Sequence, residues 1–279
     1  MMPDRTDASW NLVFASVMGT SHRQGEGGIC QDYAESRIID ARDGPVLISA
    51  VADGAGSASH SDLGAKVAVG AFLSEADTQL ASNRFDALTL EQVRSWVEAA
   101  RRQMEREAEV QGLPLRQLAC TLLVAVVGAA SALFAQVGDG VIIVDDPETD
   151  GYAYIFWPDT GEYVNTTRFL TDADYQSRVR LDQVDCPIEA LAMLTDGLQM
   201  LALDYAAEQV HGRFFAPLFE VVAASTNPES LHAGLLAFLD SPRINARTDD
   251  DKTLLLATRR NPPQVIDEPD ANDRPDATA

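Results

Sequence analysis

The chain has 279 residues, of which 46% are hydrophobic and 23% are charged, and its formal net charge is −22. These values are ordinary for a globular protein with a sizeable core, but so acidic a chain is poorly suited to bind nucleic-acid phosphates or anionic lipid. We therefore expect neither nucleic acid nor a membrane among its partners.

The cysteines and the start of the chain exclude further classes of protein. Cys30, Cys120 and Cys186 lie far apart with no CxxC spacing, so neither a disulfide framework nor a zinc ribbon is expected. Residues 1–7 show no basic start followed by an apolar stretch, and no apolar run is long enough to span a bilayer. We expect a cytoplasmic protein.

Short apolar runs separated by turn residues predict several strands in the first half of the chain. The second of these strands runs through residue 39 and turns at 40–44 into the third. A polar, glycine-rich loop at 19–28 separates the first strand from the second. The first and third strands are expected at residues 10–18 and 46–52.

Two helices should follow, at residues 61–73 and 88–110. Ser59 or Ser61 is positioned to cap the first helix. Thr89, with a glutamine three residues later, resembles a capping box at the start of the second. Both helices have an apolar face that can pack on a sheet.

The second half of the chain repeats this order of strands and then helices. Residues 158–186 are polar and irregular, and we expect a loop region there that includes a flap. Two helical segments are expected at 200–223 and 229–240. The remaining strands are expected at 120–127, 132–137, 141–144, 152–157, 188–194 and 252–258.

Strands joined by tight turns indicate antiparallel pairing, and helices that come in pairs indicate that each pair covers a sheet. The fold class expected is α+β, with two packed antiparallel sheets and helices outside. One domain is expected over residues 10–260. Residues 261–279 are rich in proline and aspartate, and we expect a disordered acidic tail there.

Aspartates recur where predicted strands meet loops. Asp53 follows the apolar run 46–52, Asp139 lies in a tight Gly-Asp-Gly turn, and Asp196 follows the run 188–194. Asp32 and Asp250 precede strands. Each Asp-Gly alone is more often just a turn, but several carboxylates brought together repel strongly unless a cation lies between them. Oxygen ligands favour hard ions such as Mg²⁺ or Mn²⁺.

Taken together, these motifs resemble the metal-dependent Ser/Thr protein phosphatases of type 2C, and particularly their compact bacterial branch. The matching segments occur in the family's order and extend over nearly the whole chain. They are residues 31–32, 51–57, 64–65, 121–123, 137–140, 195–198 and 250–253. The resemblance implies a four-layer αββα sandwich, in which helix pairs flank the two antiparallel sheets.

The resemblance also implies a centre of two Mg²⁺ or Mn²⁺ ions. Asp53 would bridge both ions and be central to catalysis, while the carbonyl of Gly54 would bind one. Asp196 and Asp250 would hold one ion, and Asp32 would act mainly through water. A possible third, weaker ion would be bound by Asp139 together with Asp196. A water activated by the metals would then attack the phosphorus in line.

Three positions depart from the family pattern. Ala55 stands where many members have a histidine that protonates the leaving group, so that proton must come from a metal-bound water or from another residue, such as His22 or His60. The phosphate-binding arginine has no clear match, and Arg23 or His22 is a substitute. Asp251 occupies the position of the usual asparagine. We take His22, in the loop before Asp32, as the second candidate catalytic residue.

The function expected is metal-dependent hydrolysis of phosphoserine and phosphothreonine in proteins, as part of bacterial signalling. Its partners would be a phosphoprotein substrate and a cognate Ser/Thr kinase, and we expect a monomer. The alternative is a phosphatase-like regulatory or scaffolding module with weak or no turnover, which the missing histidine and arginine favour. A small-molecule phosphatase on the same fold is a third possibility.

Overall fold

A computed structural model describes residues 10–23, 28–149, 151–158 and 167–260. Two five-stranded sheets form the centre of the molecule, and every strand pair in them is antiparallel. In spatial order the strands of one sheet are β1 (Trp10–Val17), β12 (Lys252–Arg259), β9 (Ala190–Leu194), β6 (Val141–Asp146) and β7 (Gly151–Tyr154). Those of the other are β2 (Tyr33–Ala41), β3 (Gly44–Ala52), β4 (Leu122–Val127), β5 (Ala132–Val137) and β8 (Arg180–Val184).

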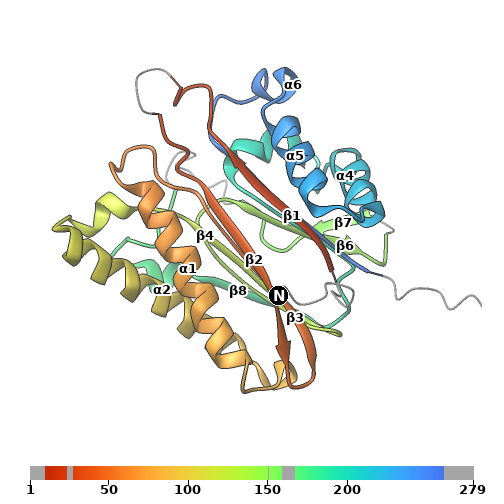
Figure 1. Cartoon of the computed structure of the whole chain (residues 1–279), viewed down its shortest axis with the longest axis horizontal. Coiled ribbons are helices and arrows are strands. Elements are labelled where there is room, and N and C mark those ends of the chain that lie inside the picture. The colour runs from red at the N-terminus through yellow and green to blue at the C-terminus, as the bar shows by residue number, and fades with distance from the viewer. Residues whose placement is uncertain (1–9, 24–27, 150, 159–166, 261–279) are drawn as a thin grey trace, which may run out of the picture.

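Pairs of helices cover the outer faces of the two sheets (Figure 1). Helices α1 (Ser61–Leu80) and α2 (Leu90–Gln111) pack on the sheet that contains β3, and α4 (Gly212–Ala224) and α5 (Pro228–Leu239) pack on the sheet that contains β12. The four-layer αββα arrangement expected from the sequence is confirmed. No helix in the described part of the chain is both long and apolar enough to cross a bilayer.

Strand β3 shows why its sequence is apolar throughout. Alternate side chains of a strand point to opposite faces of the sheet. Ile48 and Ala50 pack under α1 and α2, whereas Leu47 and Val51 pack between the two sheets, so both faces of β3 are buried. This explains a continuous apolar run rather than an alternating one.

Three expectations about secondary structure are wrong. The polar stretch 158–186 contains the fifth strand of a sheet, β8, which pairs with β5, although residues 159–166 of that stretch lie outside the described residues. The expected helix at 200–223 is interrupted by a small hairpin. No side chain caps α1, whose N-cap is His60 rather than a serine. The interrupting elements are α3 (Gln199–Ala202), β10 (Leu203–Asp204) and β11 (Gln209–Val210).

The capping box predicted for α2 is present. The side chain of Thr89 accepts a hydrogen bond from the amide of Gln92, and the side chain of Gln92 accepts one from the amide of Thr89. The expected tail at 261–279 lies outside the described residues. The short elements are η2 (Phe85–Ala87), η3 (Leu115–Leu118), η4 (Tyr175–Arg178), η5 (Asp196–Leu198) and α6 (Pro242–Asn245).

Two glycines in α1 should respond to substitution in opposite ways. A Cβ on Gly64 would lie 2.0 Å from the carbonyl oxygen of Leu118, whereas a Cβ on Gly70 would meet nothing within 4 Å. We expect Gly64→Ala to destabilise the protein by about 1–3 kcal/mol, because backbone must move. Gly70→Ala should stabilise it by about 0.4–1 kcal/mol, because it restricts the unfolded chain. Denaturant unfolding of both variants tests this, and equal effects would contradict it.

Candidate metal centre

The register of the sheets brings the predicted carboxylates to one end of the sandwich. Strands β2 and β3 pair with Tyr33 opposite Ala52. Asp32 immediately precedes one of these residues and Asp53 immediately follows the other, so the two carboxylates emerge side by side. The next strand over supports this end, because the hydroxyl oxygen of Thr121 accepts a hydrogen bond from the amide of Asp53 at 2.9 Å.

The turn between β5 and β6 carries Asp139 from one sheet to the other. Gly138 adopts φ +103°, and a Cβ there would also lie 2.5 Å from the side chain of Thr121, so this position requires glycine. In the other sheet Val141 pairs with Leu194. Asp139 therefore lies two residues before one strand of that pair, and Asp196 lies two residues after the other.

Asp53, Asp139 and Asp196 form the centre of the site. Each offers a carboxylate oxygen, and these oxygens all lie within 4.8 Å of one another. Thr167 donates a hydrogen bond to Oδ2 of Asp139 at 2.8 Å, but Oδ1 of Asp139 is buried and has no partner among the described residues. Within the described part, no ion pair neutralises any of these carboxylates.

Burial and mutual repulsion shift the acidity of these groups. Burial raises the pKa of Asp32 to about 7, although a hydrogen bond from the hydroxyl of Thr195 at 2.8 Å opposes the shift. Burial, and next the charge of Asp139, raise the pKa of Asp196 to about 6. Burial and the charge of Asp32 raise the pKa of Asp53 well above its usual range. In their ionised forms these carboxylates therefore repel one another.

An oxygen-only donor set with an unpartnered buried oxygen fits a hard divalent ion. A cation between the carboxylates would relieve the repulsion that raises the pKa of each one. The residues present therefore fit Mg²⁺ or Mn²⁺. Gly54, whose carbonyl was also predicted as a ligand, directly follows Asp53 and is buried, with its backbone bridged to Cys120.

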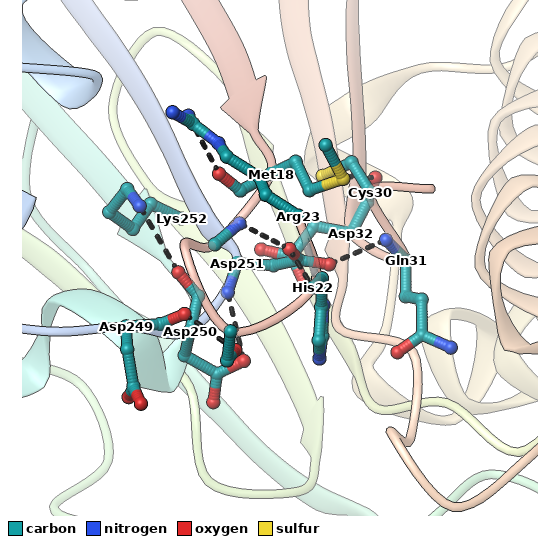
Figure 2. A network of polar contacts seen from close by, with 12 residues as sticks. Met18, His22, Arg23, Cys30, Gln31, Asp32, Asp249, Asp250, Asp251 and Lys252 are labelled. Carbon is teal, nitrogen blue, oxygen red and sulfur yellow. Dashed lines mark hydrogen bonds and ion pairs between the residues drawn. The ribbon is translucent and has the colours of Figure 1, made fainter. Parts of the chain in front are cut away.

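Asp250 and Asp251 have different surroundings although they are neighbours. Asp250 is exposed, and its charge contributes to the raised pKa values of Asp53 and Asp196, so it lies at the edge of the cluster. Asp251 is only 3% exposed, and its carboxylate accepts hydrogen bonds from the backbone amides of Gly19 and Gln31, each at 2.6 Å (Figure 2). The structure thus turns Asp251 inward, while Asp250 remains beside the carboxylate cluster.

Several residues that support the site were given no role from the sequence. Gln199 donates a hydrogen bond to the carbonyl oxygen of Asp139 and accepts one from the hydroxyl of Tyr205 at 2.9 Å. Thr195 connects Asp32 to β12, because its hydroxyl oxygen also accepts a hydrogen bond from the amide of Thr253 at 3.0 Å. Gln199 reaches the backbone of Asp139, and Thr195 the carboxylate of Asp32, across long sequence separations, so no local pattern identifies them.

The four histidines have different surroundings. Nδ1 of His22 lies 3.0 Å from Oδ1 of Asp251. Nδ1 of His60 lies 2.7 Å from the hydroxyl of Ser59. His211 and His232 each contact a backbone carbonyl through Nδ1. His22 is therefore the histidine that bonds to a carboxylate of the 249–251 loop.

Arg23 does not face the carboxylate cluster, contrary to its suggested role in phosphate binding. Its guanidinium donates hydrogen bonds to Asp240, just beyond α5, and to the carbonyl of Met18. In Figure 2 it extends away from Asp250 and from the ring of His22. The ion pair with Asp240 therefore occupies this side chain.

Comparison with known proteins identifies the family. The sequence model of the family "Protein phosphatase 2C" matches residues 18–240. The chain is also 37% identical over 255 residues to serine/threonine-protein phosphatase 3 of Escherichia coli (strain K12), covering 89% of this chain and 98% of that protein. The chain belongs to the protein phosphatase 2C family. This confirms the predicted family, a metal-dependent Ser/Thr protein phosphatase, and does not favour the regulatory alternative.

Solved structures of phosphatases share the fold of this protein phosphatase 2C chain. The catalytic domain of the serine/threonine protein phosphatase PstP, in complex with two manganese ions, matches with a TM-score of 0.59 and 14% identity, over 90% of this chain and 99% of that one. A serine/threonine phosphatase from Staphylococcus aureus matches with a TM-score of 0.58 and 17% identity, over 91% and 96% of the two chains. At these identities the likeness concerns the fold alone.

Proposed function

We propose that this chain removes phosphate from phosphoserine and phosphothreonine in proteins, with two divalent ions, Mg²⁺ or Mn²⁺, at the carboxylate cluster and with room for a weaker third. The observation that carries this proposal is the convergence of Asp53, Asp139 and Asp196 around an unpartnered buried oxygen. When bound, such ions supply positive charge to the phosphoryl oxygens and make a water molecule acidic enough to attack at neutral pH.

The residues of the chain would divide the work of holding the ions. Asp53 directly follows a strand that is buried on both faces, and its carboxylate would hold both ions. Asp196 and the exposed Asp250 would hold one ion, and the carbonyl of Gly54 would bind one as well. Asp32 is hydrogen-bonded to Thr195, which suits a role through water rather than direct contact. Asp139 would bind the third ion with Asp196.

His22 would supply the proton that the leaving oxygen of serine or threonine needs. Ala55 cannot do so, since it carries no ionisable group and is 7% exposed, packed with Ala58 and Ala119. His22 lies on the loop that follows β1. It contacts the same carboxylate, that of Asp251, as the amide of Gln31, the residue before Asp32. Proton donation by a positioned histidine typically contributes about 10²–10⁴ in rate.

We further propose a phosphatase domain over residues 10–260, a monomer located in the cytoplasm, and a cognate Ser/Thr kinase that phosphorylates the substrate. One measurement distinguishes the alternative, a scaffolding module, from the proposed phosphatase. Such a module would bind Mn²⁺ without turning over any phosphorylated substrate.

The direct test is hydrolysis of phosphoserine and phosphothreonine peptides by the full chain. We expect release of inorganic phosphate that requires added Mn²⁺ or Mg²⁺ and is abolished by excess chelator. Calorimetry with Mn²⁺ should show binding under the same conditions. Activity that persists in excess chelator would contradict the proposal, and Mn²⁺ binding without turnover on a panel of phosphopeptides would support the scaffolding alternative instead.

A further inference from the structure

Asp251 forms a hub beside the carboxylate cluster. Its Oδ1 accepts hydrogen bonds from the amide of Gly19 at 2.6 Å and from His22, and its Oδ2 accepts one from the amide of Gln31 at 2.6 Å. The residue is almost fully buried, yet nearby Asp32 adds further negative charge. A buried carboxylate is tolerated where its oxygens accept hydrogen bonds, and the donors around Asp251 supply them.

This contact fixes the orientation of the imidazole of His22. An ionised carboxylate only accepts hydrogen bonds, so the nitrogen 3.0 Å from it, Nδ1, must carry the hydrogen. The other ring nitrogen, Nε2, has no hydrogen-bond partner among the described residues, and the side chain is 29% exposed. Figure 2 shows the ring between the 249–251 loop and Gln31, with its free end away from Asp251. Asp251 therefore leaves Nε2 available to a substrate.

The hydrogen bonds of Asp251 also tie His22 to the backbone beside the carboxylate cluster. Gln31 immediately precedes Asp32, and its carbonyl oxygen lies 2.6 Å from where a Cβ of Gly54 would be. Gly19 also approaches closely, since a Cβ there would lie 2.3 Å from the carbonyl oxygen of Asp249. Backbone packed this tightly moves little, so the position of Nε2 relative to Asp32 and Gly54 is set by Asp251.

We propose that Asp251 is a positioning residue, which holds His22 so that Nε2 donates the proton to the leaving oxygen in a chain whose Ala55 cannot. This inference rests on the phosphatase function proposed above. It also links two departures from the family pattern, at 55 and 251. The amide of an asparagine at 251 could donate to Nδ1 as well as accept from it, whereas an ionised carboxylate only accepts and so keeps the hydrogen on Nδ1.

The proton transfer balances as follows. The oxygen of water forms a bond to phosphorus, the bond from phosphorus to the serine or threonine oxygen breaks, and the electron pair stays on that oxygen. The hydrogen on Nε2 passes to it, giving a neutral hydroxyl, while Nδ1–H stays on Asp251. The proton that the attacking water releases restores the charge of His22 through solvent. The products are the dephosphorylated side chain and inorganic phosphate.

Substrates with different leaving groups separate this role from a structural one. The leaving oxygen of p-nitrophenyl phosphate is weakly basic and gains little from a proton donor, whereas that of a phosphoserine peptide gains much. We expect His22→Asn to lower kcat on the peptide by about 100-fold and on the aryl phosphate by less than about 5-fold. Asp251→Asn should change the ratio of the two rates in the same direction, by about 10-fold or more.

Controls isolate the pair of residues. Asp249→Asn removes a neighbouring exposed carboxylate and should leave both rates unchanged. His60→Asn tests the other candidate donor and should leave the ratio unchanged. The double variant of His22 and Asp251 should lose no more peptide activity than His22→Asn alone, because both changes disable the same proton transfer. A folding defect would lower both rates together and keep their ratio.

The outcomes distinguish the two levels of the hypothesis. If the wild-type chain with Mn²⁺ hydrolyses neither substrate, the proposed function fails. If it hydrolyses both and the ratio stays the same in Asp251→Asn and His22→Asn, the present inference and the proton-donor role of His22 are overturned, whereas the proposed metal-dependent hydrolysis stands. A leaving-group effect in His60→Asn but not in His22→Asn would also overturn it.

Discussion

Asp53→Asn is expected to lower the rate of phosphopeptide hydrolysis by at least about 100-fold while making the metal-free protein more stable. The substitution keeps the size of the side chain but removes its charge. Activity falls because the carboxylate at the centre of the cluster, which we propose as a metal ligand, is lost. Stability rises because Asp53 is the group whose charge is opposed by burial and by four other aspartates, Asp32, Asp139, Asp196 and Asp250.

Thermal unfolding with and without Mn²⁺ measures both parts of this prediction. In chelator, the variant should unfold several degrees above the wild type, since about 1 kcal/mol corresponds to about 2–4 °C for a chain of this size. With Mn²⁺ the order should reverse, because binding stabilises the wild-type fold and the variant binds more weakly. A variant less stable than the wild type in chelator would contradict the repulsion described here.

Asp145→Asn is a matched control outside the cluster. The carboxylate of Asp145 accepts hydrogen bonds from the amides of Glu189 at 2.8 Å and Ala190 at 2.9 Å. These hydrogen bonds stabilise the folded state. Removing its charge should destabilise the protein by about 1 kcal/mol with or without metal and leave the activity intact. If Asp53→Asn stabilises the metal-free protein and Asp145→Asn destabilises it, the carboxylate of Asp53 lowers the stability of the metal-free fold.

Most of the strands could be predicted from the sequence because their own side chains are buried and therefore apolar. The run that became β3 is apolar at every position, since one face packs under helices and the other between the sheets. The missed strand β8 is an edge strand with the sequence RLDQV, and its side chains are only partly buried or exposed. Its pairing with β5 comes from backbone hydrogen bonds, which leave no hydrophobic pattern to detect.

The same reasoning explains what was predicted of the site. Aspartates that end buried strands were identifiable because an apolar run stops abruptly at each one, and antiparallel pairing brings such ends together. The supports were not identifiable. Gln199 and Thr167 reach Asp139 from segments far along the chain. The sequence also could not separate the roles of neighbouring Asp250 and Asp251, which differ only in the direction that each side chain takes.

The metal-free protein is expected to lose stability as the pH rises from about 4 to 8, on the order of a few kcal/mol in total. Burial raises the pKa of Asp32 from 3.8 to about 7 and that of Asp196 from 3.8 to about 6. The folded state therefore binds more protons than the unfolded state between these values. Stability falls with rising pH wherever the folded state binds more protons, so the contribution of these two groups is fully present below about 4 and is lost by about 7.

Denaturant unfolding in chelator at pH 5, 6, 7 and 8 would measure this dependence. The chain's net charge of −22 gives a slope of the same sign, because general repulsion also grows as carboxylates ionise. Asp32→Asn separates the two causes. It keeps an oxygen that can accept the hydrogen bond from Thr195 but removes the titrating group, so it should flatten the dependence between pH 5 and 7. If the dependence of stability on pH is the same in Asp32→Asn as in the wild type, its cause is the general repulsion between surface charges and not Asp32.

Saturating Mn²⁺ should reverse the slope. Metal ions bind carboxylates only in their deprotonated form, so binding strengthens as the pH rises through the pKa values of Asp32 and Asp196. The stability that binding adds then increases with pH and offsets the repulsion that weakens the metal-free protein. The same buried carboxylates therefore make the fold less stable at neutral pH without an ion and more stable with one, and a slope unaffected by Mn²⁺ would mean that the cluster does not hold the metal.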